Sequence, residues 1–183
     1  FILALLSAIV IGGLIGYFSK YFSSIVSLVN ALRMIPAPAW LSLSILWFGI
    51  GHASAIFIIW IGCFFPIFLN TLAGIGRAEQ IQIETVLTFG GNKFDVLMEV
   101  ILPVSYHHIV TGARIGLGIG WITVVTAELA SVDIGAGLGW MISDSRVLLD
   151  TTTVLSGIFV VGLLGLITDV MLKKFDGLVQ GWS

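Results

Sequence analysis

The chain has 183 residues and a formal net charge of −2, and its composition indicates a membrane protein. Hydrophobic residues make up 58% of the chain and charged residues only 10%, whereas an ordinary soluble domain has about 25% charged residues. The mean hydropathy of +1.12 agrees with this assignment. We therefore expect contact with membrane lipid and none with nucleic acid, and the single cysteine, Cys63, excludes a disulfide or zinc framework.

Five apolar segments predict membrane-spanning helices, because about 20 mostly apolar residues cross a bilayer as a helix. The expected helices cover residues 1–17, 35–48, 53–75, 108–130 and 152–172. A turn is expected at the Gly49-Ile50-Gly51-His52 stretch, between the second and third of them. Strand-length runs of alternating polarity are absent, which favours an all-α polytopic bundle over a membrane barrel.

Residues 1–183 are expected to form one transmembrane domain that is incomplete at its N-terminus. Phe1 opens within an apolar stretch, without an initiator Met or a flanking charge.

The distribution of lysine and arginine predicts the orientation of the chain. Only Arg146 falls on one expected side, and the other side holds Lys20, Arg33, Arg77, Lys93, Arg114, Lys173 and Lys174. Because positive residues favour the cytoplasmic side, we expect the C-terminus and the loop at about 77–103 to be cytoplasmic. The segment at about 131–151 is then external.

The loop at 77–103 is expected to contain two short helices. Paired glycines, Gly90 and Gly91, end the first, and Asn92 with Asp95 three residues later predicts a capping box at the start of the second. Pro103 is expected to end the second helix before the next span. Its apolar face is expected to be formed by Phe94, Leu97, Met98 and Ile101.

The spacing of residues in this loop resembles that of binding-protein-dependent ABC importer permeases. Their loop has the pattern E-A-A, three residues, G, nine residues, I, any residue, L-P, and the positions here are Glu84, Thr85, Val86, Gly90, Val100, Leu102 and Pro103. Thr85 and Val86 replace the two alanines, and Val100 replaces the isoleucine. Further stretches, 35–40, 47–51, 111–118 and 127–129, are similar to the nitrate, taurine and alkanesulfonate branch.

The resemblance implies a multi-pass permease of a bacterial-type inner membrane, of the type I ABC importer fold. Residues 84–103, Gly91 included, would couple it to two cytoplasmic ATPase subunits. The other implied partners are a paired permease chain, as in a homodimer, and an external solute-binding protein. The chain itself would be no enzyme and would bind no cofactor, with ATP and Mg on the ATPase subunits, since no GxxxxGK[ST] motif is present. The implied cargo is a small anion such as taurine or another sulfonate, nitrate or bicarbonate.

Three residues are candidates for the pathway or a gate: Glu128, Trp121 and Trp47. An acid within a span is a functional hypothesis, and the alternative for Glu128 is pairing with Thr123 or Thr126. Trp121 lines the pathway or fills the core.

Other features have structural interpretations. Gly112, Gly116 and Gly120 predict a close packing seam within the bundle or at a dimer contact. Arg114, within this seam, is expected to snorkel to phosphates or cap a loop. Aromatic belts explain Trp40, Trp140 and Trp182. Pro36 and Pro38 are expected to break the first turn of their span near its cytoplasmic entry.

The external segment offers four charged residues to a binding protein, unless it is a solvated loop without a partner: Asp133, Asp144, Arg146 and Asp150. A different class, a self-sufficient secondary transporter or channel, stays open at this point. Secondary transport usually requires paired ionisable groups in the membrane, and Glu128 and Asp169 are the only deep acids.

Overall fold

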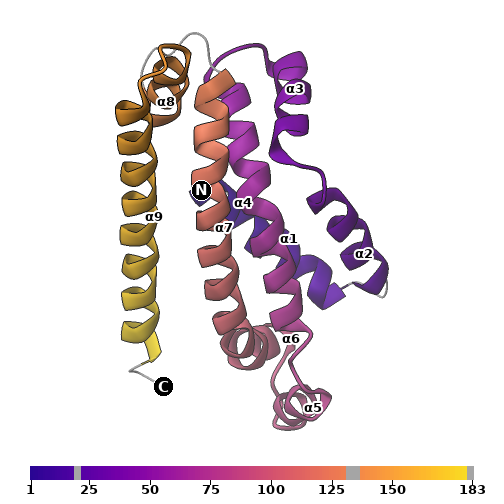
Figure 1. Ribbon diagram of the computed structural model, residues 1–183. Coiled ribbons are helices and arrows are strands. Elements are labelled where there is room, and N and C mark those ends of the chain that lie inside the picture. Colours follow the sequence, from indigo (N-terminus) through magenta and orange to yellow (C-terminus); the bar gives the residue numbers. More distant parts are fainter. Residues whose placement is uncertain (19–21, 131–136, 181–183) are drawn as a thin grey trace.

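The computed structural model describes residues 1–18, 22–130 and 137–180, and its regular structure there is entirely helical (Figure 1). The elements in chain order are α1 (Ile2–Phe18), α2 (Phe22–Arg33), α3 (Ala37–Phe48), α4 (His52–Ile75), α5 (Gln80–Thr88), α6 (Lys93–Val96), the π-helix η1 (Leu97–Ile101), α7 (Leu102–Ala130), α8 (Leu138–Val147) and α9 (Thr151–Gln180). The predicted polytopic helical bundle is confirmed.

Within the described residues, three helical stretches are long and apolar enough to cross a membrane: His52–Ile75, Lys93–Glu128 and Thr151–Lys174. They run alternately down and up the bundle (Figure 1). The helix α1 has 17 residues and is slightly short for a span, and α2 and α3 follow each other from the lower to the upper end. The chain therefore passes repeatedly through one bundle.

The second expected span, at 35–48, is only the short helix α3, and the helix α2 that precedes it was missed by the sequence interpretation. Helices α2 and α3 have 12 residues each and would each reach only about 18 Å, against about 30 Å of hydrocarbon. Between them, residues 34–36 leave the helix, and Pro36 is the extended N-cap of α3. Pro36 is thus not near a cytoplasmic entry but at an internal break.

The turn predicted between the second and third segments is confirmed. Gly49 and Gly51 have positive φ angles of 74° and 145°, which side chains disfavour, and α4 begins directly after them at His52.

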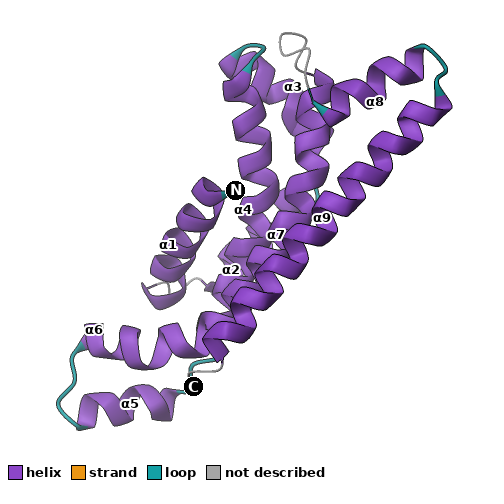
Figure 2. Ribbon diagram, turned by 90° about the vertical axis from the view of Figure 1, so that its left-hand side faces the viewer, coloured by secondary structure: helices purple, strands orange, loops and turns teal. Residues whose placement is uncertain are grey.

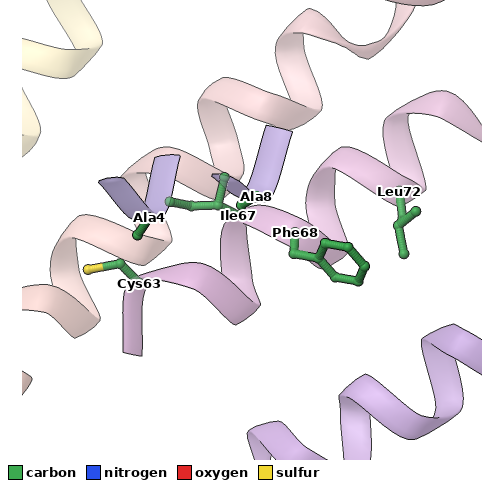
Figure 3. Close-up of a cluster of buried hydrophobic side chains, with 6 residues drawn as sticks. All are labelled: Ala4, Ala8, Cys63, Ile67, Phe68 and Leu72. Atoms are coloured by element: carbon green, nitrogen blue, oxygen red, sulfur yellow. The ribbon is translucent and has the colours of Figure 1, made fainter. Parts of the chain in front are cut away.

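The core lies where α1 and α7 pack on α4. Figure 3 shows one buried cluster, formed by Ala4, Ala8, Cys63, Ile67, Phe68 and Leu72. On α7, a Cβ added at Gly116 would come within 2.9 Å of Ile67, and one at Gly120 within 2.9 Å of Cys63 Sγ. The predicted glycine seam therefore lies inside the bundle, between α4 and α7.

Candidate coupling surface and pathway residues

The loop expected to couple the chain to a partner forms a knob of two short helices at one end of the bundle. Figure 2 shows α5 and α6 side by side below the spans. Helix α5 begins at a capping box of Glu79 and Gln82 and contains no buried residue. We call residues 80–101 the knob from here on.

The paired glycines end α5 in a sharp turn, as predicted. Gly90 has a φ angle of 88°, which favours glycine, and its amide donates to the Leu87 carbonyl at 3.1 Å. The Gly91 amide donates to the Val86 carbonyl at 2.9 Å, and a Cβ on Gly91 would come within 2.6 Å of the Val86 side chain. A side chain at Gly91 would clash with Val86, so the turn between the two helices would have to shift.

The capping box at the start of α6 is confirmed. The Asn92 side chain accepts from the amides of Phe94 and Asp95, and Asp95 Oδ2 accepts from the Asn92 amide at 2.7 Å. All three hydrogen bonds join residues at most three positions apart, so the local sequence determines them.

The predicted stop at Pro103 is wrong. The helix continues from Lys93 through η1 into α7, and Pro103 lies in the first turn of α7. Proline within a helix clashes with the carbonyl four residues earlier, here Glu99. The wider π turn over Leu97–Ile101 contains that carbonyl, which gives the helix a way to continue past the proline.

The knob is fixed to the bundle by a small apolar cluster. Ile75 at the end of α4 packs with Val96 and Ile101, and Ile83, Val86 and Leu97 border them. Phe94 and Met98 were expected on the buried face, but they are 61% and 46% exposed. The apolar face of the second helix is therefore rotated toward Val96 and Val100.

The motif residues divide between two environments. Thr85 and Val100 line one hollow between the knob helices, and Thr85, Val86 and Gly91 line a neighbouring one. Leu102 instead lines a hollow against α1, together with Phe94. Glu84 is exposed and accepts a hydrogen bond from the Gln80 amide at 3.0 Å. Pro103 is exposed at the base of α7.

Sequence reasoning did not single out Phe89, which is 88% exposed at the C-cap of α5. With Ile81 and Leu87 it gives the knob an uncovered apolar surface. Its position directly before the paired glycines is the signal that could have identified it.

Comparison with known proteins decides the family. A sequence profile described as "binding-protein-dependent transport system inner membrane component" matches residues 8–180. The chain belongs to this family of ABC transporter permeases. It is 40% identical, over its whole length, to a putative ABC transporter permease protein of Methanocaldococcus jannaschii, of which it covers 68%.

Two further relatives carry named cargoes. The chain is 36% identical to the taurine transport system permease protein TauC of Escherichia coli, over 85% of its own length and 56% of that protein. It is 30% identical to the nitrate import permease protein NrtB of Leptolyngbya laminosa, over 93% of its own length and 61% of that protein. The chain thus spans between about half and two thirds of these relatives. Membership of the binding-protein-dependent permease family favours an ABC permease over a self-sufficient transporter or channel.

Within this permease, Glu128 joins α7 to α8. Its Oε2 accepts from the Gly139 amide at 2.6 Å, and a Cβ at Gly137 would come within 2.5 Å of the Glu128 carboxyl carbon. Thr123 and Thr126, the expected partners, donate instead to carbonyls of their own helix. Glu128 therefore serves α8 as an N-terminal cap supplied from another helix.

The other pathway candidates have different surroundings. Trp121 Nε1 donates to the Thr168 hydroxyl at 3.0 Å, which links α7 to α9. Trp47 is 58% exposed and makes an edge contact with Phe57 on α4, with ring centroids 5.9 Å apart.

Arg114 neither snorkels nor caps a loop. Its guanidinium contacts Asp169 Oδ1 of α9 at 2.9 Å, and Lys173 lies 3.6 Å from the other oxygen. This ion pair is a second link between α7 and α9.

The segment at about 131–151, which the sequence interpretation places outside the cell, is described only from Gly137 onward. Helix α8 follows there, at the end of the bundle opposite the knob (Figure 1). Asp133, Lys20 and Trp182 lie outside the described residues. In the part of the chain that is described, no three His, Cys, Asp or Glu side chains come together as a metal site.

Proposed function

We propose that this chain is the membrane subunit of an ATP-driven importer and that it passes a small anionic solute between paired permease chains. Two cytoplasmic ATPase subunits would supply the energy through the knob, and an external binding protein would deliver the solute. The taurine and nitrate permeases among the relatives support a sulfonate or nitrate cargo.

The observation that carries the proposal is the knob itself. It projects from one end of the bundle, it contains the permease motif from Glu84 to Val100, and it exposes Ile81, Leu87 and Phe89 without a covering element among the described residues. A protein partner that buries these side chains would remove apolar surface from water, worth about 25 cal/mol per Å².

The charge distribution supports a cytoplasmic knob and a cytoplasmic C-terminus. Arg77 precedes the knob and Lys93 lies within it, and Lys173 and Lys174 lie in the C-terminal part of α9, which ends on the same side of the bundle as the knob (Figure 1). Arg146 lies in α8 at the opposite end. Cytoplasmic loops of membrane proteins carry such an excess of Lys and Arg.

The continuous helix gives the knob a mechanical route to the far end. Residues Lys93–Glu128 form one helical stretch, so a displacement of the knob by ATPase closure would move α7 as a near-rigid unit. At its far end, Glu128 is bonded to α8. The knob would thereby control the arrangement of α7, α8 and α9 around the pathway.

Replacement of Gly90 by proline tests the coupling role. Proline fixes φ near −65°, whereas Gly90 has a φ of 88°, so the turn cannot keep its shape. We expect Gly90→Pro to insert in the membrane but to co-purify with less than about a tenth of the ATPase, since a docking hot spot is worth about 2 kcal/mol or more.

The matched control is Gly118→Ala in α7, where an added Cβ meets no atom within 4 Å. This variant should bind the ATPase normally. If Gly90→Pro co-purifies with as much ATPase as the native chain, the knob does not have the proposed coupling role.

A further inference from the structure

The break between α2 and α3 lies level with the middle of α4. Arg33, the last residue of α2, and Pro36 line the same cavity as Ile61, Gly62 and Phe65, which are central residues of the 24-residue helix α4. The sequence interpretation assigned Arg33 to the cytoplasmic side, and this depth corrects it. Irregular backbone at membrane depth is tolerated only where protein buries it or a watery cavity adjoins it.

The cavity lies between α3, α4 and α7 and has a volume of about 220 Å³. Its walls are mostly apolar, from residues such as Ile35, Pro66 and Ile119. Pockets for drug-sized ligands have about 300–1,000 Å³, so this cavity suits a small solute.

Two hydrogen-bond donors in the cavity wall lack a described partner. The ion pairs among the described residues all converge on Asp169, so none of them engages Arg33. Trp40 also lines the cavity, and its Nε1 is buried without an acceptor in the described part of the chain. Trp40 therefore does not belong to an interfacial belt. The buried Trp40 N–H without an acceptor costs about 1–3 kcal/mol, so an occupant with acceptor oxygens would be stabilised, whereas the Arg33 side chain is exposed.

We propose that this cavity binds the oxyanion group of the transported solute, a sulfonate or nitrate, with the Arg33 guanidinium and the Trp40 indole N–H as its donors. The proposal rests on the importer function and specifies its site.

The chemistry of the wall selects an anion. Arg33 is the one charged residue among the described residues that line the cavity, and no acid offsets it. Guanidinium groups match planar or tetrahedral oxyanions with paired N–H donors, and apolar walls strengthen these contacts. A charge within the membrane is expensive unless it serves a function.

Charged thiol reagents test the proposal on the full-length permease purified in a zwitterionic detergent. Ile119→Cys, made in a Cys63→Ser background, places a thiol in the cavity wall. The probes are the methanethiosulfonate reagents with an ethylsulfonate or an ethyltrimethylammonium group. Ile81→Cys on the exposed side of α5 supplies the intrinsic reactivity ratio of the two reagents.

We compare the labelling rate of the anionic reagent with that of the cationic reagent at each position. This ratio should be about tenfold higher at Ile119→Cys than at Ile81→Cys, which corresponds to a difference in barrier of about 1.4 kcal/mol. Arg33→Gln should abolish this preference, and Arg33→Lys should keep part of it. Methanesulfonate should protect Ile119→Cys, and Trp40→Phe should weaken the protection while the charge preference stays.

A preference that persists in Arg33→Gln, or the absence of protection by methanesulfonate, would overturn the proposal. Protection by added phosphatidylglycerol alone would assign the cavity to a lipid headgroup and overturn the solute site. The labelling needs no ATPase, so Gly90→Pro should leave it unchanged. Failure of the coupling role and failure of the anion site are therefore distinguishable.

Discussion

At the scale of single residues, Glu128 holds the start of α8 by a hydrogen bond, and substitutions can separate this role from the negative charge of its side chain. Its carboxylate accepts from the Gly139 amide, in the first turn of α8. Glu128→Gln keeps a carbonyl oxygen that can accept this bond, whereas Glu128→Ala leaves the amide open. We expect Glu128→Ala to lower the local stability of α8 by about 1 kcal/mol, the usual cost of losing a cap, and Glu128→Gln to retain most of it.

Hydrogen exchange of the Gly139 amide measures this effect, with about fivefold faster exchange per kcal/mol expected in Glu128→Ala. Thr126→Ala is the matched control, because Thr126 donates within its own helix. Unchanged Gly139 exchange in Glu128→Ala would show that the carboxylate does not hold α8.

Asp150 caps α9 and makes its first turn sensitive to pH. The Thr153 hydroxyl and then the Thr153 amide hold the pKa of Asp150 below its ordinary value of 3.8; desolvation opposes them with a smaller effect, and the Thr152 amide adds the smallest contribution. Since the folded pKa is lowered, the stabilisation is present above pH 3.8 and is lost as the pH falls through the folded pKa.

We expect the protection of the Thr152 and Thr153 amides to fall in this acid range in the native chain. Asp150→Asn can still cap the helix but does not titrate, so its protection should stay constant. A parallel loss of protection in Asp150→Asn would exclude the carboxylate as the cause.

The sequence predicts residue contacts well when they are local. Asn92 and Asp95 are three positions apart, and their capping box was predictable. Arg114 and Asp169 are 55 positions apart and meet only because α9 packs beside α7, so no local pattern could indicate their ion pair. The hydrogen bond between Glu128 and the Gly139 amide also depends on the packing of two helices, α7 and α8, so the sequence did not predict it.

At the scale of elements, the glycines of α7 set its distance from α4. We expect Gly116→Val to destabilise the permease by about 1–3 kcal/mol, because its Cβ alone would come within 2.9 Å of Ile67 and 3.0 Å of the Cys63 carbonyl. Thermal unfolding in detergent measures the loss.

Gly118→Val is the control, two residues away on the same helix, where a Cβ meets nothing within 4 Å. Equal unfolding temperatures for the two variants would contradict the close packing of α7 against α4 at Gly116.

Hydropathy located the long helices but missed α2. The sequence of α2, FSSIVSLVNALR, includes three serines, an asparagine and an arginine, which conceal a membrane segment from a search for apolar runs. The Pro36-Ala37-Pro38 stretch was the visible signal of a break, but the sequence alone could not place it at mid-depth. At Pro103 the sequence predicted a helix end where the helix continues. The π turn that precedes the proline is a property of the folded helix and could not be predicted.

At the scale of the whole molecule, the bundle has two different ends. One carries the knob, with the exposed side chains of Ile81 and Phe89, and the other carries α8, with an exposed Val147. The proposed function requires the ATPase at the first end only. The external partner would then meet the second.

Crosslinking from the two ends tests this central claim most directly. Cysteines introduced as Phe89→Cys and Val147→Cys, each in a Cys63→Ser background, are labelled with a short photoactivatable crosslinker in the assembled transporter. Both positions are strongly exposed, 88% and 74%, so their labelling is comparable. We expect crosslinks to the ATPase from position 89 and none from position 147. Crosslinks to the ATPase from position 147, without any from position 89, would contradict the account.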